Sequence, residues 1–216
     1  MQSNRNTHVT QQMAIELLAK PCREAGVHRD DFKKYFSSDK VQRMIREMTR
    51  FLPQETSHLK LIDSVTLNAC EAGPGISPEN KGPFTYVDSD FDRLGAHTVS
   101  KPTDAVQAYV YEQTKDGTYA EIYGSFDTDL DLLQFETEEQ IKEFVKSHRH
   151  LLHPKGWATH FMFRNKAGKR FVAYVSWDAG GDLGVYVSRF SYSSEWYASS
   201  AYRFVVLATR SLRTQN

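Results

Sequence analysis

The hydrophobic positions of the first fifty residues recur every three or four positions, which is the spacing of an amphipathic helix. This pattern predicts helices over 13–20, 29–36 and 41–52, and a proline follows the first and the third. The third helix would carry bases on its polar face, namely Arg43, Arg46 and Arg50. We therefore expect residues 1–56 to form a helical N-terminal segment, followed by a separate α+β domain over 57–216.

The pattern changes to strand-like alternation after residue 58. "LKLIDSVTLNA" (59–69) predicts a strand, and the glycines and prolines of "GPGISPENKGPF" (73–84) predict a loop. Residues 105–126 alternate on both sides of Asp116 and Gly117, which predicts a β-hairpin with its turn at this pair.

The second half of the chain predicts one helix and then four strands. Thr137 and Gln140 match a capping box that opens an amphipathic helix. "WATHFMFR", "RFVAYVSW", "LGVYVSR" and "YRFVVLATR" then read as successive strands separated by turn-rich connectors. We expect an α+β fold with N-terminal helices, a largely antiparallel sheet, one packed helix and a C-terminal four-strand meander.

The composition of the 216 residues, 40% of them hydrophobic, is that of a globular protein with a sizeable core. No apolar run approaches the roughly 18 residues that cross a bilayer, and the first residues lack the apolar centre of a signal peptide. The two cysteines lie outside any C-x-x-C pattern. We therefore expect a cytoplasmic protein without membrane contact and without a cofactor.

The chain has no net charge, but its charges are segregated. Residues 104–139 carry ten acidic residues and one lysine, whereas residues 142–170 carry eight basic residues and one glutamate. One interpretation is that the two blocks pair with each other in the folded protein.

The other interpretation is that the basic block binds an anionic partner, either a nucleic acid or an acidic protein. Basic residues gather around the hairpin 155–170 and on the helix before it, and the candidate anion-binding residues are Arg149, Lys155, Arg164, Lys169 and Arg170. Aromatic residues alternate with them, as in proteins that stack single-stranded bases. Strand alternation nevertheless places Trp157, Phe161 and Phe163 on the side opposite Arg164, so these three rings are expected in the core.

Half of the eight histidines lie in "HRHLLHPKGWATH" (148–160). His150, His153 and His160 could bind zinc with a water as the fourth ligand, which would make the protein a metal-dependent hydrolase. However, His148 lies on the apolar stripe of the predicted helix, and the other three are expected to point in different directions.

The loop "FSYSSEWYASSA" (190–201) is rich in tyrosine and serine, a composition that suits ligand recognition. Tyr192, Trp196 and Tyr197 are candidate ligand-binding residues, or else Trp196 folds back over the sheet. The chain contains neither a G-x-S-x-G motif nor a Walker A loop. The leading hypothesis is therefore a non-enzymatic cytoplasmic binding or interaction domain, with the zinc hydrolase as the alternative.

Overall fold

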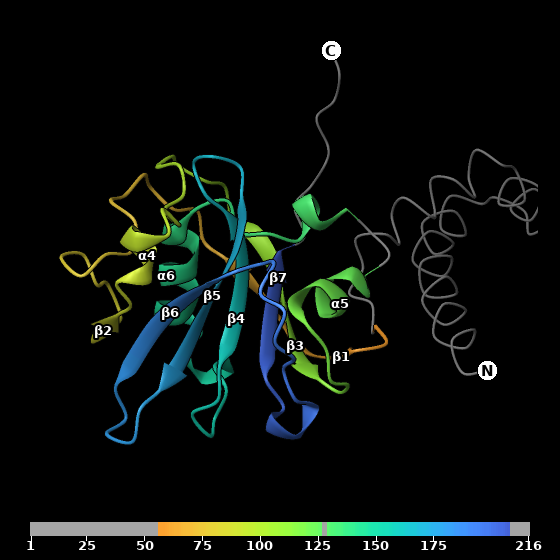
Figure 1. The fold of residues 1–216 in the computed structure, drawn as a ribbon. Coiled ribbons are helices and arrows are strands. Elements are labelled where there is room, and N and C mark those ends of the chain that lie inside the picture. Colours follow the sequence, from red (N-terminus) through yellow and green to blue (C-terminus); the bar gives the residue numbers. More distant parts are fainter. Residues whose placement is uncertain (1–55, 127–128, 208–216) are drawn as a thin grey trace, which may run out of the picture. The chain divides into compact units, whose positions relative to one another are not determined.

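A computed structural model describes residues 56–126 and 129–207, and Figure 1 shows the arrangement of their helices and strands. The helices predicted before Pro53 lie outside the described residues. The described part is a seven-stranded, mostly antiparallel sheet with short helices on both of its faces. This agrees with the predicted α+β class.

The strands follow the sheet in the order β1-β3-β7-β4-β5-β6-β2. Their bounds are Leu59–Leu67 for β1, Tyr86–Val87 for β2, Val106–Gln113 for β3, Thr159–Arg164 for β4, Arg170–Trp177 for β5, Leu183–Arg189 for β6 and Arg203–Leu207 for β7. Neighbouring strands are antiparallel except at two places, where β7 runs parallel to β4 and β2 runs parallel to β6.

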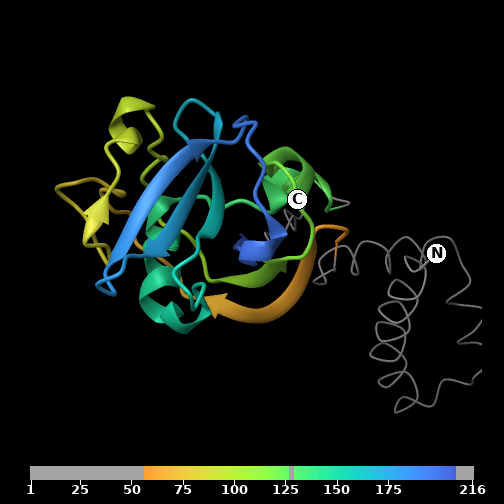
Figure 2. The ribbon, with the colours of Figure 1, turned by 60° about the horizontal axis from the view of Figure 1, so that its bottom comes forward.

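Three α-helices and three 3-10 turns accompany the sheet. They are α4 (Asp90–Arg93), α5 (Tyr119–Gly124), α6 (Glu138–Ser147), η1 (Leu130–Leu132), η2 (Arg149–Leu151) and η3 (Ala198–Ser200). Figures 1 and 2 show α6 on one side of the sheet and α5 on the other. Each face therefore has its own hydrophobic core, because alternate side chains of every central strand point to opposite faces.

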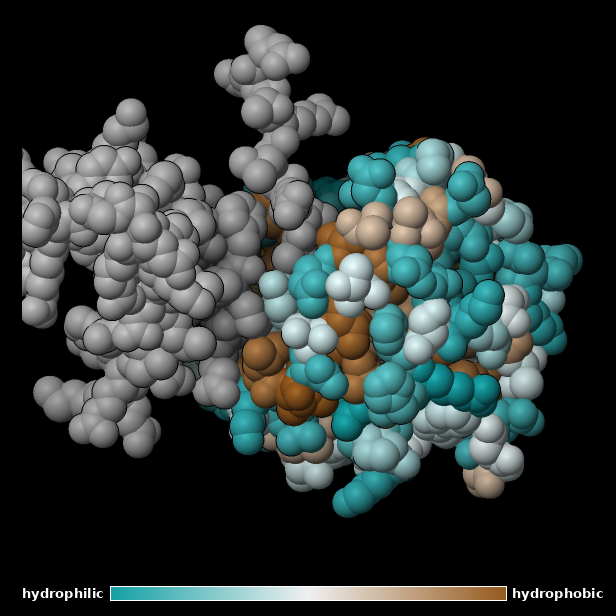
Figure 3. Space-filling view, turned by 180° about the vertical axis from the view of Figure 1, so that it is seen from behind, coloured by the Kyte–Doolittle hydropathy of each residue, from teal (hydrophilic) through white to brown (hydrophobic). Residues whose placement is uncertain are grey.

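Strand β4 shows how one segment supplies both cores. Phe161 and Phe163 pack with Phe144 of α6, and Met162 packs with Tyr123 of α5. The expectation of a core position is confirmed for both phenylalanines and is wrong for Trp157, which is 49% exposed because it precedes β4 in a loop. The outer surface on the α6 side is mostly hydrophilic, with apolar residues grouped in a narrow central band (Figure 3).

The capping box predicted for the main helix is confirmed. The Thr137 hydroxyl accepts a hydrogen bond from the Gln140 amide, and the Gln140 side chain accepts one from the Thr137 amide. Ile141, Phe144 and Val145 are buried on one face of α6. His148 belongs to the same stripe but is the C-cap residue.

The predicted hairpin over 105–126 is wrong in its second arm. β3 ends at Gln113, and residues after Gly117 form α5 instead of a strand. Thr118 and Glu121 form a second capping box, which satisfies the free amides of the first turn. Helical spacing then buries Tyr119, Ile122 and Tyr123 together.

The predicted four-strand meander is correct only for β4, β5 and β6. β7 does not pair with β6 but lies between β3 and β4. Residues 190–202 therefore carry the chain from the end of β6 across the α5 face to the start of β7, beside Thr159. The rings that fill this crossing, such as Trp196, form part of the second core. No helix of the described residues is long and apolar enough to span a membrane.

Candidate functional site

Two of the predicted anion-binding residues are engaged with an acidic partner. Arg164 and Arg170, opposite each other on β4 and β5, both donate to Asp131 Oδ1 over 2.5 Å. The hydrogen bond from Arg164 lowers the pKa of the Asp131 carboxyl, and Arg170 adds to this effect. The acidic and basic blocks therefore do meet here, as the first interpretation of the charge pattern proposed.

Lys169 lies at the same end of the sheet, in the turn that joins β4 to β5, and it is exposed. Its amide donates to the Asn165 side chain, which closes the turn. This end of the sheet thus contains the ion pairs of Arg164 and Arg170 with Asp131 and two exposed cations, Lys166 and Lys169.

Arg149 and Lys155 lie at the opposite end of β4 and β5. The guanidinium of Arg149 is 4.4 Å from the centroid of the Trp177 ring, at the end of β5. Lys155 lines a hollow of about 520 Å³ together with Trp157, Trp177 and the turn 178–181. Among the described residues neither Arg149 nor Lys155 forms an ion pair. The structure therefore separates the five predicted residues into two groups.

The loop that carries Lys155 is shaped by its own backbone contacts. The Lys155 amide donates to Nδ1 of His153, and the His153 amide donates to the Thr159 hydroxyl. Gly156 has a φ of +81°, and a Cβ there would lie 3.2 Å from the Trp177 carbonyl oxygen. Glycine thus permits both the turn and the close approach to β5.

Trp157 follows this glycine and remains 49% exposed although its ring is held in place. Its centroid is 6.0 Å from that of Tyr202, in an edge-to-face contact. Asp178 is the acidic residue of the hollow, and it accepts the amides of Gly180 and Asp182. We name the group Arg149, Lys155, Trp157 and Trp177 the tryptophan hollow.

The histidines proposed as zinc ligands are not brought together. His160 is fully buried beneath Trp196, His153 is buried in its loop, and His150 is exposed on η2. The structure places no three histidine, cysteine, aspartate or glutamate residues as a metal-binding group within 56–126 and 129–207. The zinc-site alternative therefore lacks the geometry that it requires.

His160 is instead an aromatic core residue. Its ring stacks on Phe204 and meets the rings of Trp196 and Tyr174. The Tyr119 hydroxyl lies 3.2 Å from its Nδ1. Burial lowers the pKa of His160 to about 3, so the ring is neutral at pH 7.

The three candidate residues of the loop 190–202 separate in the structure. Trp196 folds back onto the sheet, where its carbonyl accepts from the Gln113 side chain. Tyr192 and Tyr197 are 50% and 57% exposed. The alternative interpretation of Trp196 is thus confirmed, and the two tyrosines remain on the surface.

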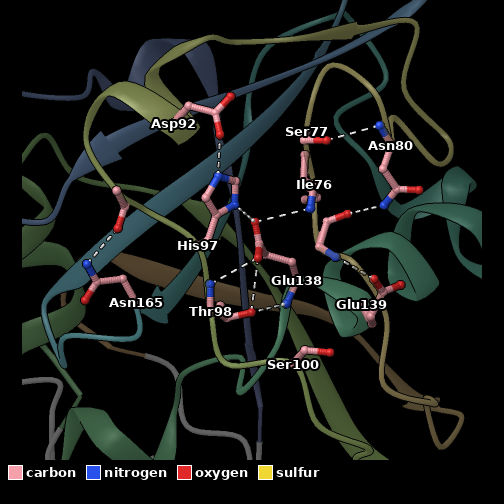
Figure 4. Close-up of polar contacts among 12 residues, drawn as sticks. Ile76, Ser77, Asn80, Asp92, His97, Thr98, Ser100, Glu138, Glu139 and Asn165 are labelled. Carbon is pink, nitrogen blue, oxygen red and sulfur yellow. Dashed lines mark hydrogen bonds and ion pairs between the residues drawn. The ribbon is translucent and has the colours of Figure 1, made fainter.

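A second pocket, of about 690 Å³, was not predicted from the sequence. It lies between the loop 72–79, residues 97–100 and the first turn of α6. Figure 4 shows its centre, where the buried carboxylate of Glu138 accepts from the amides of Ile76 and Thr98. Both nitrogens of His97 also face carboxylates, Nδ1 that of Glu138 at 3.2 Å and Nε2 that of Asp92 at 2.8 Å.

Glycines allow the loop to approach these acids closely. A Cβ at Gly75 would lie 2.6 Å from Glu138 Oε2, and one at Gly73 would lie 2.3 Å from Glu139. The Gly75 amide donates to Glu139. In the sequence, the two glycines of "GPG" (73–75) indicate a loop. Their spacing alone does not show that they pack against Glu138 and Glu139, some sixty residues later.

His97 and Ser100 of this polar pocket are engaged with other groups of the protein. A histidine base needs one nitrogen free to take a proton from a nucleophile, and both nitrogens of His97 face carboxylates. The hydroxyl of Ser100, in the pocket lining, donates to the Gly73 carbonyl. We conclude that Glu138 and His97 fasten the loop to α6.

No protein-family model, no curated protein and no solved structure matches the chain.

Proposed function

We propose that the protein is a non-enzymatic binding module that recognises the base and phosphate of single-stranded nucleic acid at the tryptophan hollow. The observation that carries this proposal is the pairing of a half-exposed ring, Trp157, with two cations, Lys155 and Arg149, that form no ion pair with the residues the structure describes. Aromatic faces stack bases of any sequence, and basic side chains bind the backbone phosphates.

Charge and an exposed ring together favour this end of the sheet over the hairpin turn, where the exposed Lys166 and Lys169 have no aromatic residue beside them in the turn 165–169. Arg164 and Arg170 already bind Asp131, so a phosphate would have to displace a carboxylate from them. A phosphate that binds Lys155 and Arg149 would displace no carboxylate of the described residues. The carboxylate of Asp178 is held by two turn amides, which partly offset its charge near the hollow.

The fixed conformation of the hollow also supports binding. Gly156 holds the loop against β5, and Tyr202 holds the Trp157 ring at its edge. A ring that is already positioned loses little rotational entropy when a base stacks on it.

A salt titration with a fluorescently labelled single-stranded oligonucleotide tests the proposal. Two phosphate contacts predict that the logarithm of the binding constant falls with log salt at a slope of about −1.4. Lys155→Gln should reduce that slope by about 0.7, since each cation releases its own counterions. Absence of binding at low salt, or a slope near zero, would contradict the proposal.

Two competition experiments then distinguish a nucleotide ligand from an acidic protein. A mononucleotide that competes with the oligonucleotide at equal concentration of bases would show that a single base and phosphate suffice. If polyglutamate competes as well as the oligonucleotide does, the partner is an acidic protein and the base plays no part.

A further inference from the structure

Three tyrosines on neighbouring strands form a row on the α5 face of the sheet, apart from the tryptophan hollow. They are Tyr86 of β2, Tyr186 of β6 and Tyr174 of β5. Their ring centroids are 5.3 Å apart for Tyr86 and Tyr186, and 5.2 Å apart for Tyr186 and Tyr174. Figure 1 shows no helix in front of β5 and β6, and Tyr86 is 51% exposed. We call these three residues the tyrosine row.

Acidic residues border the row on the same face. β2 pairs with β6 so that Tyr86 is opposite Gly184, and the Asp88 amide continues the pairing by donating to Val185. Because alternate residues of a strand share a face, Asp88 lies on the side of Tyr86, next to Tyr186. Asp178 follows directly after β5, which ends at Trp177, and its carboxylate contributes, after burial, Tyr86 and Asp88, to the raised pKa of the Tyr186 hydroxyl.

The bases near this row offset these acids only in part. Arg189 of β6 is on the opposite face, since it has the parity of the core residues Val185 and Val187. Arg93 of α4 pairs with Asp90 and also interacts with the charge of Asp88, and Lys81 donates to the Thr85 carbonyl next to Tyr86. At Tyr174, however, burial and then the carboxylate of Asp88 raise the pKa of the hydroxyl, so the negative charge there favours a cationic ligand.

The row offers one half-exposed ring to a peptide. Tyr174 and Tyr186 stack on each other, and Tyr174 also meets the rings of His160 and Trp196. The ring of Tyr86 is therefore the one on which a proline could lie. The hydroxyl of a neighbouring tyrosine can donate to a backbone carbonyl of an extended peptide, since a polyproline II helix leaves its carbonyls unpaired.

We propose that the tyrosine row docks a proline-rich peptide in the polyproline II conformation, with an arginine or lysine of the peptide beside Asp88. Proline rings pack on tyrosine faces, and aromatic-lined surfaces are the usual receptors for this conformation. The carboxylate supplies the charge that selects a basic peptide over a neutral or acidic one.

A purely structural role accounts for only part of the row. The ring of Tyr186 covers Gly184, where a Cβ would lie 3.0 Å from Tyr186 Cε2, and Tyr174 stacks on it. Tyr86 adds a ring that remains half exposed, and Asp88 adds a charge. The test therefore uses these two residues.

The probe is a fluorescein-labelled peptide of three Pro-Pro-Arg repeats, and its binding to the full chain is followed by fluorescence anisotropy. Tyr86→Ala is expected to weaken binding by about tenfold, the loss of one stacked ring. Asp88→Asn retains the acceptor for the Asp90 amide and should weaken binding by about threefold. Tyr197→Ala removes a similarly exposed tyrosine outside the row and should change affinity by less than about twofold.

Two control peptides identify the occupant. Replacing each arginine by glutamate, or each proline by glycine, should weaken binding by at least about tenfold. Thermal melts monitored by circular dichroism confirm that the variants are folded. Absence of peptide binding, equal binding of either control peptide, or equal loss in Tyr197→Ala would overturn the proposal. So would Tyr86-dependent binding of a neutral glucan hexasaccharide in place of the peptide.

Discussion

His97 and Glu138 are 41 residues apart in the chain and meet at the first turn of α6, where His97 Nδ1 lies 3.2 Å from Glu138 Oε1. The side chain of Glu138 is 1% exposed, whereas that of His97 is 25% exposed. The carboxylate also accepts from the amides of Ile76 and Thr98 and from the Thr98 hydroxyl. One buried acid therefore joins three segments of the chain.

Glu138→Ala should lower the free energy of unfolding by about 3 kcal/mol, because it leaves several buried donors without an acceptor. Glu136→Ala is the control two residues earlier. Its side chain is 43% exposed and pairs with Lys101, so we expect a loss of at most about 1 kcal/mol. Urea unfolding of both variants measures the difference. Equal losses would show that the buried network has no special role.

The close approach of the loop to α6 can be tested at its glycine. Gly75 and Gly168 both have positive φ, +81° and +76°, but a Cβ would meet Glu138 at Gly75 and open space at Gly168. Gly168→Ala should cost about 1 kcal/mol of stability for the backbone conformation alone. Gly75→Ala should cost about 2 kcal/mol more, since the methyl group displaces the carboxylate. Denaturant midpoints of the two variants compare these costs, and similar values would mean that the loop moves aside freely.

The buried imidazole of His160 predicts a pH dependence of stability. Its pKa is about 3 in the folded protein because of burial, below its ordinary value of 6.5. The unfolded chain therefore binds a proton that the folded chain excludes, so stability is complete above pH 6.5 and falls as pH decreases towards 3.

Within that window, this group should remove up to about 1.4 kcal/mol per pH unit. His160→Phe keeps an aromatic ring among Trp196, Tyr174 and Phe204 and has no proton to bind. Its loss of stability between pH 7 and pH 5 should be smaller than that of the natural protein. Identical pH profiles from urea titrations would contradict the burial of a neutral ring.

Local signals in the sequence predicted much of the sheet and the main helix. Thr137 and Gln140 are three residues apart, and their capping box forms as expected. Alternation in β4 correctly placed Phe161 and Phe163 in the core. These features depend on neighbours in the sequence, whose geometry is fixed by one helix or one strand.

The features that failed depend on distant partners or on a competing local signal. The alternation after Gly117 suggested a strand, but Thr118 and Glu121 supply a cap that favours α5. Strand order could not be read from the chain, because the return of β7 to β4 is set by the packing of Trp196 and its neighbours across the sheet. The same limitation hid the contact of Gly75 with Glu138 and the engagement of Arg164 with Asp131.

The central claim is that the tryptophan hollow, and not the hairpin turn, binds single-stranded nucleic acid. The most direct measurement is the dissociation constant of a labelled oligonucleotide for Trp157→Ala and for Lys169→Gln, with the natural protein as reference. We expect Trp157→Ala to lose about 1–3 kcal/mol of binding free energy, the value of one stacked base, and Lys169→Gln to bind within about twofold of the reference. Unchanged affinity in Trp157→Ala, or an equal loss in Lys169→Gln, would contradict the assignment.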